Sequence, residues 1–152
     1  MYEQPYCFTS TDKLGQAFTT EATSTYSFDL GATGKYIGNA GKNIVFRAIV
    51  RTAFETLTSG VRIQICTSDS ADGSSDRAVG QLYTSATDDD GVIPVTDLAT
   101  AGDQAFGVIA PNIPLLRYIH IAFVPVSEAA SAGKLDVYME DGAGEAGTGC
   151  VA

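Results

Sequence analysis

Apolar and polar residues alternate with a period of two in several separate segments of this 152-residue chain. The clearest run is VRIQICTS at 61–68, where Val61, Ile63 and Ile65 alternate with Arg62, Gln64 and Cys66. Successive side chains of a strand point to opposite faces, so this pattern predicts a strand with one buried face. No segment has a strong helical period. We therefore expect an all-β fold.

Seven further strands are predicted, at 25–31, 43–51, 81–86, 92–98, 104–110, 115–126 and 134–140. The 115–126 segment is the most apolar and is expected to be central. The 92–98 segment is expected at an edge, because Pro94 cannot donate a ladder hydrogen bond. Eight strands joined by Gly-, Ser- and Asp-rich turns predict a β-sandwich, a barrel or an eight-stranded jelly roll.

The strand at 43–51 has one apolar face and one face that mixes apolar and basic residues. The mixed face carries Arg47 and Arg51 beside Val45 and Ile49. Two explanations remain open at this point. A neighbouring molecule covers the mixed face, or the arginine stems lie over apolar surface of the same domain.

The chain is long enough for one domain, which we place at 21–141, and 45% hydrophobic residues suffice for its core. Residues 1–20 are expected to form an extended N-terminal arm, and the Gly/Ala-rich residues 142–152 a flexible C-terminal tail. The arm carries large apolar side chains, so it should dock on its own domain or on a neighbouring subunit. These side chains are Tyr2, Tyr6, Phe8, Leu14 and Phe18.

The net charge of −9 disfavours nucleic-acid binding, which depends on basic residues that neutralise phosphates. The N-terminus lacks a basic start and a long apolar run, so we expect no signal peptide. No stretch approaches the ~20 apolar residues of a membrane helix. A soluble protein that is not exported is expected, with neither nucleic acid nor membrane as a partner.

The residues with reactive or metal-binding side chains are few. Cys7, Cys66 and Cys150 are widely spaced, so reduced thiols are expected, with an intermolecular bond at Cys150 as the alternative. Cys66 is expected to pack as a small apolar residue. The single histidine, His120, is interpreted as a core or interface residue. Since no nucleophile motif occurs, we predict no enzyme and assign no catalytic residue, cofactor or metal ligand.

Two loops are rich in carboxylates, one with Asp69, Asp72 and Asp76 and the other at 88–90. Neither has the spacing of an EF-hand. Solvated turns are the expected structure, and a weak Ca²⁺ site is the alternative.

Five segments follow one another in an order that carries more information than any single motif. They are KLGQAF (13–18), ATSTYSFDLG (22–31), VRIQICTSDSADGSS (61–75), FGVIAPNIPLLRYIHIAFVPV (106–126) and AGKLDVYME (132–140). This order resembles the jelly-roll capsid cement, or decoration, proteins of tailed bacteriophages. The resemblance implies a homodimer or homotrimer, made in the host cytoplasm, that binds the major capsid protein on the outer surface of the virion and stabilises the head.

Contacts with the shell are expected from the aromatic arm and from basic strand residues. The candidates are Tyr2, Tyr6, Phe8, Arg47, Arg51 and Arg62. The alternative function is a carbohydrate-binding jelly-roll module of a phage tail or a bacterial surface, for which Tyr83 and Tyr138 could supply aromatic stacking. An enzyme is the third possibility.

Overall fold

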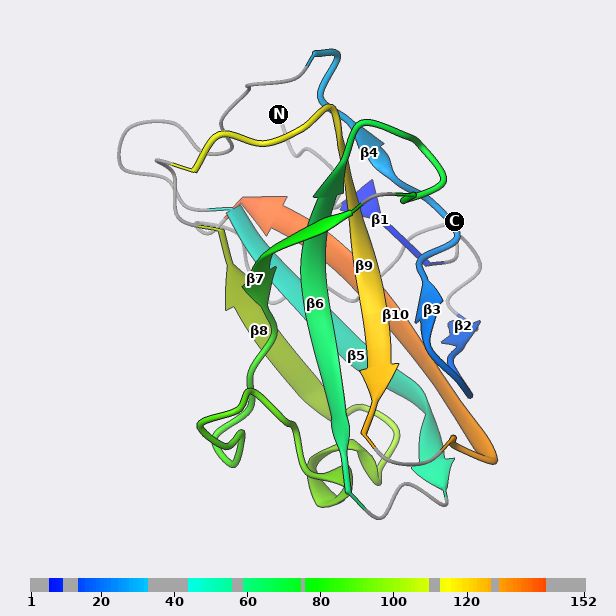
Figure 1. Ribbon diagram of the computed structural model, residues 1–152. Helices are drawn as coiled ribbons and strands as arrows, with labels where there is room; N and C mark the ends of the chain where they lie inside the picture. Colours follow the sequence, from blue (N-terminus) through cyan, green and yellow to red (C-terminus); the bar gives the residue numbers. More distant parts are fainter. Residues whose placement is uncertain are drawn as a thin grey trace.

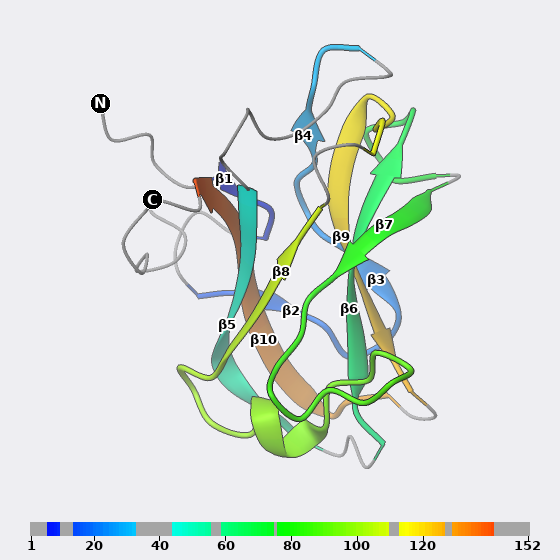
Figure 2. The same cartoon turned by 90° about the vertical axis from the view of Figure 1, so that its left-hand side faces the viewer.

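Two antiparallel sheets lie face to face and form a β-sandwich, as the computed structural model shows (Figures 1 and 2). The structure describes residues 6–9, 14–32, 44–55, 59–74, 76–109, 113–126 and 129–141. The first sheet has the order β1 (Tyr6–Cys7), β10 (Ala132–Asp141), β5 (Ile44–Glu55), β8 (Gln104–Val108), and β2 (Gln16–Ala17) also pairs with β10. The second has the order β3 (Ala22–Thr23), β9 (Tyr118–Pro125), β6 (Val61–Ser68), β7 (Arg77–Gln81), and β4 (Phe28–Asp29) pairs with β9.

The core fills the space between the two sheets with the inward residues that the alternation predicts. Val61, Ile63 and Ile65 on β6 are fully buried, and the inward residues of β5 and β10 face them from the other sheet. The Phe123 ring stacks on Phe18 and Phe54, with ring centroids 4.9 and 5.4 Å apart. Such aromatic pairs add to the stabilisation that burial gives. The predicted central position of 115–126 is confirmed, because β9 lies between β6 and the short strands β3 and β4.

Part of the expected arm belongs to the sandwich itself. β1 pairs with β10 through Tyr6 opposite Met139, and β2 pairs with the same strand. Phe8 has no exposed surface, and the Tyr6 ring packs edge-on against Phe8 and Phe28 at 5.2 and 4.9 Å. The aromatic side chains of residues 6–8 thus dock on their own domain. Tyr2 and the tail at 142–152 lie outside the described residues.

The local structure differs from the sequence prediction at several places. The described residues contain ten strands rather than eight, four of which have only two residues. The expected strand at 92–98 reduces to one bridge, Ile93 to Val61, followed by the 3-10 helix η1 (Val95–Leu98). The expected strand at 81–86 reduces to the end of β7 and an isolated bridge at Tyr83. Among the described segments, none forms a helix that is long and apolar enough to cross a membrane.

Candidate functional site

Three large apolar side chains are exposed together at one edge of the first sheet. Tyr83, Phe106 and Val108 have exposed fractions of 50%, 42% and 50%. Tyr83 and Phe106 are bridge partners joined by two backbone hydrogen bonds, 2.7 and 3.0 Å long. Phe106 and Val108 are two residues apart on β8, so their side chains share a face. We call Tyr83, Phe106 and Val108 the aromatic surface.

An open depression of about 370 Å³ adjoins the aromatic surface. Tyr83 and Phe106 form part of its lining, and short polar and acidic side chains form the rest. Its other lining residues are Thr84, Ser85, Thr96, Asp97, Asp103 and Gln104. The depression therefore combines aromatic faces with hydrogen-bonding groups.

Arg47 lies directly opposite Phe106 on the neighbouring strand β5, on the outer face of the first sheet. Its guanidinium is 4.8 Å from the centre of the Phe106 ring and makes a 2.6 Å ion pair with Glu140. Both side chains of this pair are about nine-tenths buried. Burial raises the pKa of the Glu140 carboxyl, and the charge of Arg47 opposes that shift. Arg47 thus packs against the Phe106 ring and presents little surface to a partner.

Arg51 makes a second ion pair on the same outer face. Its Nε lies 2.7 Å from Asp136 Oδ2, and the Thr9 hydroxyl donates a 3.0 Å hydrogen bond to Asp136 Oδ1. Asp136 is fully buried. Both arginines of the mixed face thus make ion pairs within the chain, which neither of the two explanations from the sequence had named.

The remaining predicted contact residues are scattered. Arg62 donates a 3.0 Å hydrogen bond to the carbonyl of Asp90 at an exposed position. Phe8 is buried and offers nothing to a partner in this conformation, and Tyr6 is half-buried. Tyr138, proposed for sugar stacking, is fully buried, whereas Tyr83 is exposed. Tyr2 lies outside the described residues.

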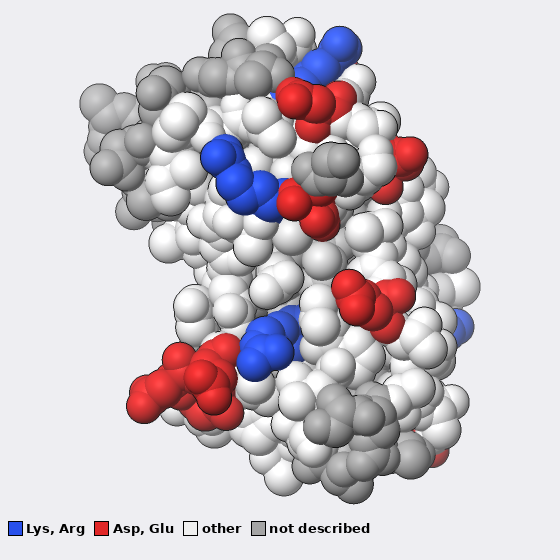
Figure 3. All heavy atoms as spheres, viewed as in Figure 1, with Lys and Arg blue, Asp and Glu red and all other residues white. Residues whose placement is uncertain are grey.

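Charged side chains are spread thinly over the face formed by the second sheet. Figure 3 shows small acidic and basic groups separated by uncharged surface. The described acidic residues of the loops act partly as turn-formers. Asp88 Oδ1 accepts hydrogen bonds from the amides of Asp90 and Val92, and Asp72 Oδ1 accepts one from Ser74. These contacts match the expected solvated turns.

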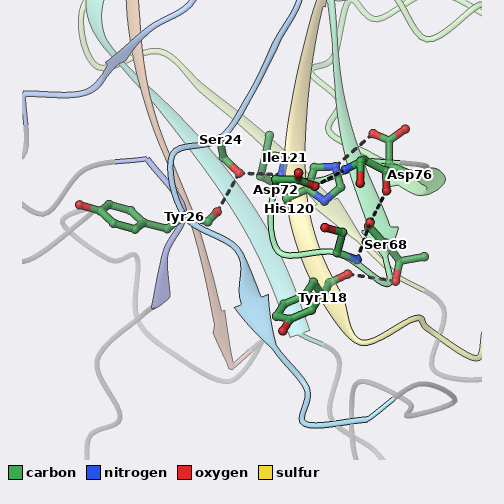
Figure 4. A network of polar contacts seen from close by, with 11 residues as sticks. Ser24, Tyr26, Ser68, Asp72, Asp76, Tyr118, His120 and Ile121 are labelled. Carbon is green, nitrogen blue, oxygen red and sulfur yellow. Dashed lines mark hydrogen bonds and ion pairs between the residues drawn. The ribbon is translucent and has the colours of Figure 1, made fainter.

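Asp76 behaves differently, because it lies close to two buried residues, Cys66 and His120. Figure 4 shows Asp76 beside His120. Cys66 on β6 and His120 on β9 are paired across the two strands and lie on the outer face of the second sheet. The Asp76 Oδ2 atom lies 3.1 Å from His120 Nε2, and the Cys66 Sγ atom lies within 4.8 Å of the ligand atoms of both residues. We call Cys66, Asp76 and His120 the polar trio.

The thiol of the polar trio is a poor nucleophile. Burial, and then the negative charge of Asp76, raise the pKa of Cys66 to about 12. The thiolate that attacks electrophiles is therefore scarce at neutral pH. Although it contains Cys, His and Asp, the trio does not have the activated nucleophile of a cysteine hydrolase.

The sequence analysis did not bring the polar trio together. It interpreted Cys66 as an apolar packing residue, His120 as a core or interface residue and Asp76 as part of a solvated turn. The available signal was that Cys66 and His120 fall on the outward side of their strands, opposite the isoleucines. To place Cys66 beside His120, one would also have had to know that β6 pairs with β9. The prediction of reduced thiols is wrong for Cys7, which is disulfide-bonded, while Cys66 is free.

Comparisons with known proteins assign the chain to no family. No protein-family model matches it, and no curated protein matches it significantly.

Proposed function

We propose that this protein is a capsid decoration protein of a tailed bacteriophage, with the jelly-roll topology that its order of segments suggests. It binds the outside of the head, bridges major capsid protein subunits and acts as a homodimer or homotrimer. The observation that carries the proposal is the aromatic surface, because contiguous exposed apolar side chains mark protein-binding surfaces.

The aromatic surface suits a rigid contact. Tyr83 and Phe106 are fixed by the bridge between their backbones, and Arg47 packs against the Phe106 ring. Aromatic side chains bury a large area and lose little rotamer freedom on binding. Individually weak contacts are sufficient on a capsid, because many copies bind a repeating lattice.

The composition also supports an external position. Inside a head, a protein with a net charge of −9 would be repelled by the packaged DNA. A protein on the outer surface does not contact that DNA. In this proposal Tyr83, Phe106 and Val108 replace Phe8, Arg47 and Arg51, which the sequence analysis had expected to contact the shell. Tyr2, Tyr6 and Arg62 stay as peripheral contacts.

The test adds purified protein to expanded, undecorated phage heads and measures bound protein and the melting temperature of the shell. We expect binding and a higher melting temperature with the native chain. Both should be lost in the double variant Tyr83→Ser/Phe106→Ser. Tyr26→Ser is the matched control, because Tyr26 is similarly exposed, at 44%, but lies outside the aromatic surface. Absence of binding by the native chain would refute the proposal.

The depression favours a second function, the binding of a carbohydrate. Sugars stack on aromatic rings and hydrogen-bond to acidic and amide side chains, and the depression offers Tyr83 and Phe106 beside Asp97 and Gln104. A glycan array tests this function directly. Binding of a defined sugar that Gln104→Ala abolishes would support it. Capsid binding that Gln104→Ala leaves intact would separate the two functions.

A further inference from the structure

We propose that the polar trio is a binding site for Zn²⁺, with Cys66 Sγ, Asp76 Oδ and His120 Nε2 as three protein ligands. The ligand atoms of the three side chains all lie within 4.8 Å of one another. The site is a property of this chain alone, so its test does not depend on the proposed capsid function.

The donor atoms select the kind of metal. A thiolate, an imidazole nitrogen and a carboxylate oxygen suit Zn²⁺, whereas Ca²⁺ prefers a shell of oxygen atoms only. Tetrahedral zinc bonds of about 2.0–2.3 Å place neighbouring ligand atoms roughly 3.3–3.6 Å apart. The 3.1 Å separation of Asp76 and His120 is already near this value. The other separations of ligand atoms are at most 4.8 Å, so the side chains would have to close by about 1 Å to share one ion.

The backbone fixes two of the ligands rigidly. Cys66 and His120 lie directly opposite each other on β6 and β9, the central strands of the second sheet, and each is 2% exposed. Asp76 comes from the start of β7, where the loop after β6 returns to the sheet. Within the described structure, His120 Nδ1 is buried and lacks a hydrogen-bond partner. Coordination through Nε2 would leave the ring proton of His120 on Nδ1.

The loop between β6 and β7 closes over the histidine. Gly73 has a positive φ of +78°, and a Cβ atom there would lie 3.0 Å from His120 Nε2. Glycine is thus required both by the backbone conformation and by the close approach to the ring. Of the trio, Asp76 alone lines an open depression of about 400 Å³, so an ion arriving from solvent would meet the Asp76 carboxylate first.

The experiment uses the full chain, freed of metal by chelation, and titrates Zn²⁺ by calorimetry and Co²⁺ by absorption spectroscopy. We expect one ion per chain, a thiolate-to-cobalt charge-transfer band, the visible bands of tetrahedral Co²⁺ and a melting temperature that rises by several degrees with Zn²⁺. Ca²⁺ should give no such rise.

Three variants connect these signals to the trio. Cys66→Ser should abolish the charge-transfer band, and Asp76→Asn and His120→Gln should each weaken Zn²⁺ binding at least tenfold. Asp72→Asn is the matched control, because Asp72 lies in the same loop and binds only within it. Circular dichroism would check that each variant is folded. Asp76→Asn should disturb folding least, because Asp76 is the exposed member of the trio.

Two results would overturn the proposal. One is a native chain that binds no Zn²⁺, and the other is a Zn²⁺ affinity that a folded Asp76→Asn variant retains in full. Either result would identify the trio as a buried hydrogen-bonded cluster without a metal.

Discussion

The thiol of Cys66 shows how far a local environment changes a side chain. Its pKa of about 12, against an ordinary 9.0, makes the thiolate about a thousandfold scarcer at neutral pH, and the side chain is 2% exposed. Both effects slow any reaction at sulfur. They also mean that a metal ion would have to displace a tightly held proton.

We therefore predict that Cys66 resists iodoacetamide in the folded, metal-free protein and reacts readily in guanidinium. Mass spectrometry of the peptide that contains Cys66 measures the labelled fraction under both conditions. In the Asp76→Ala variant the labelling of Cys66 should be faster, because this substitution removes the negative charge that opposes ionisation of the thiol and opens the site. Rapid labelling of native Cys66 would contradict the burial described above.

Asp29 gives a second prediction at the level of one residue. Two 2.9 Å hydrogen bonds from Arg117 hold its carboxylate, and these, with the Gly31 amide, lower the pKa of Asp29 below its ordinary 3.8. Folding lowers this pKa, so the stabilisation is complete above pH ~4 and is lost as the pH falls through the lowered value. The pair is exposed, so its effect on stability is small and sensitive to salt.

Carboxyl titration by NMR checks this shift. Arg117→Gln should move the pKa of Asp29 up toward its ordinary value. Asp72 is the internal control, because its pKa is lowered by hydrogen bonds from Ser74 and Ser70 and no arginine contributes. An unchanged Asp29 titration in the variant would show that Arg117 is not the cause.

At the level of the strand, Gly133 determines how β10 enters the first sheet. The pairing of β10 with β5 shifts register on both sides of Lys134, and Gly133 has a φ of +148°. A Cβ atom at Gly133 would overlap the buried Phe54 ring. The irregularity thus brings backbone and aromatic ring into direct contact, which only glycine allows.

Gly133→Ala should therefore destabilise the protein more than Gly102→Ala. Gly102 has a φ of +99° but open space around it, so its variant carries the backbone strain without the clash. We expect a difference of about 1–3 kcal/mol in the free energy of unfolding, which is the usual effect of overpacking. Urea denaturation of the two variants measures it. Equal losses would show that the Phe54 ring simply moves aside.

The sequence predicted those elements whose structure depends on their own pattern. The inward faces of β5, β6 and β10 follow from the alternation of apolar residues, and the central place of β9 follows from its being the most apolar segment. The two-residue strands and η1 could not be predicted, because single bridges such as Tyr83 to Phe106 depend on which strand lies alongside. The polar trio was missed for the same reason. His120 is far from Cys66 and Asp76 in the sequence, and only the β6–β9 register brings Cys66 beside His120.

At the level of the whole molecule, Phe8 ties the start of the described chain to the common core. It is fully buried, and its amide donates a 2.8 Å hydrogen bond to the carbonyl of Val137 on β10. The Phe8 ring also stacks on Phe46 of β5, with centroids 5.9 Å apart. A residue that the sequence placed in an arm is thus part of the sandwich.

Phe8→Ala should lower the free energy of unfolding by about 3–5 kcal/mol, as for other large-to-small core substitutions. Leu14→Ala is the control in the same part of the chain and should have little effect, because Leu14 is 63% exposed. Thermal unfolding followed by circular dichroism measures both. A small loss for Phe8→Ala would mean that residues 6–9 detach without disturbing the core. A shell-binding test of the arm should accordingly remove only residues 1–5.

The position of β10 between β1 and β5 has a consequence for synthesis on the ribosome. The residues between β5 and β10, 56–131, must be added before the first sheet can close. At about 5–20 residues per second this takes roughly 4–15 s. During that time β1, β2 and one edge of β5 wait for β10, and the other edge of β5 is also unpaired until β8 has been added. Nascent chains with such unpaired edges are prone to aggregate. Where many ribosomes translate this protein close together, the unpaired strands of different nascent chains would therefore pair with one another. The yield of native protein should depend on chaperones that shield β5 until β10 emerges.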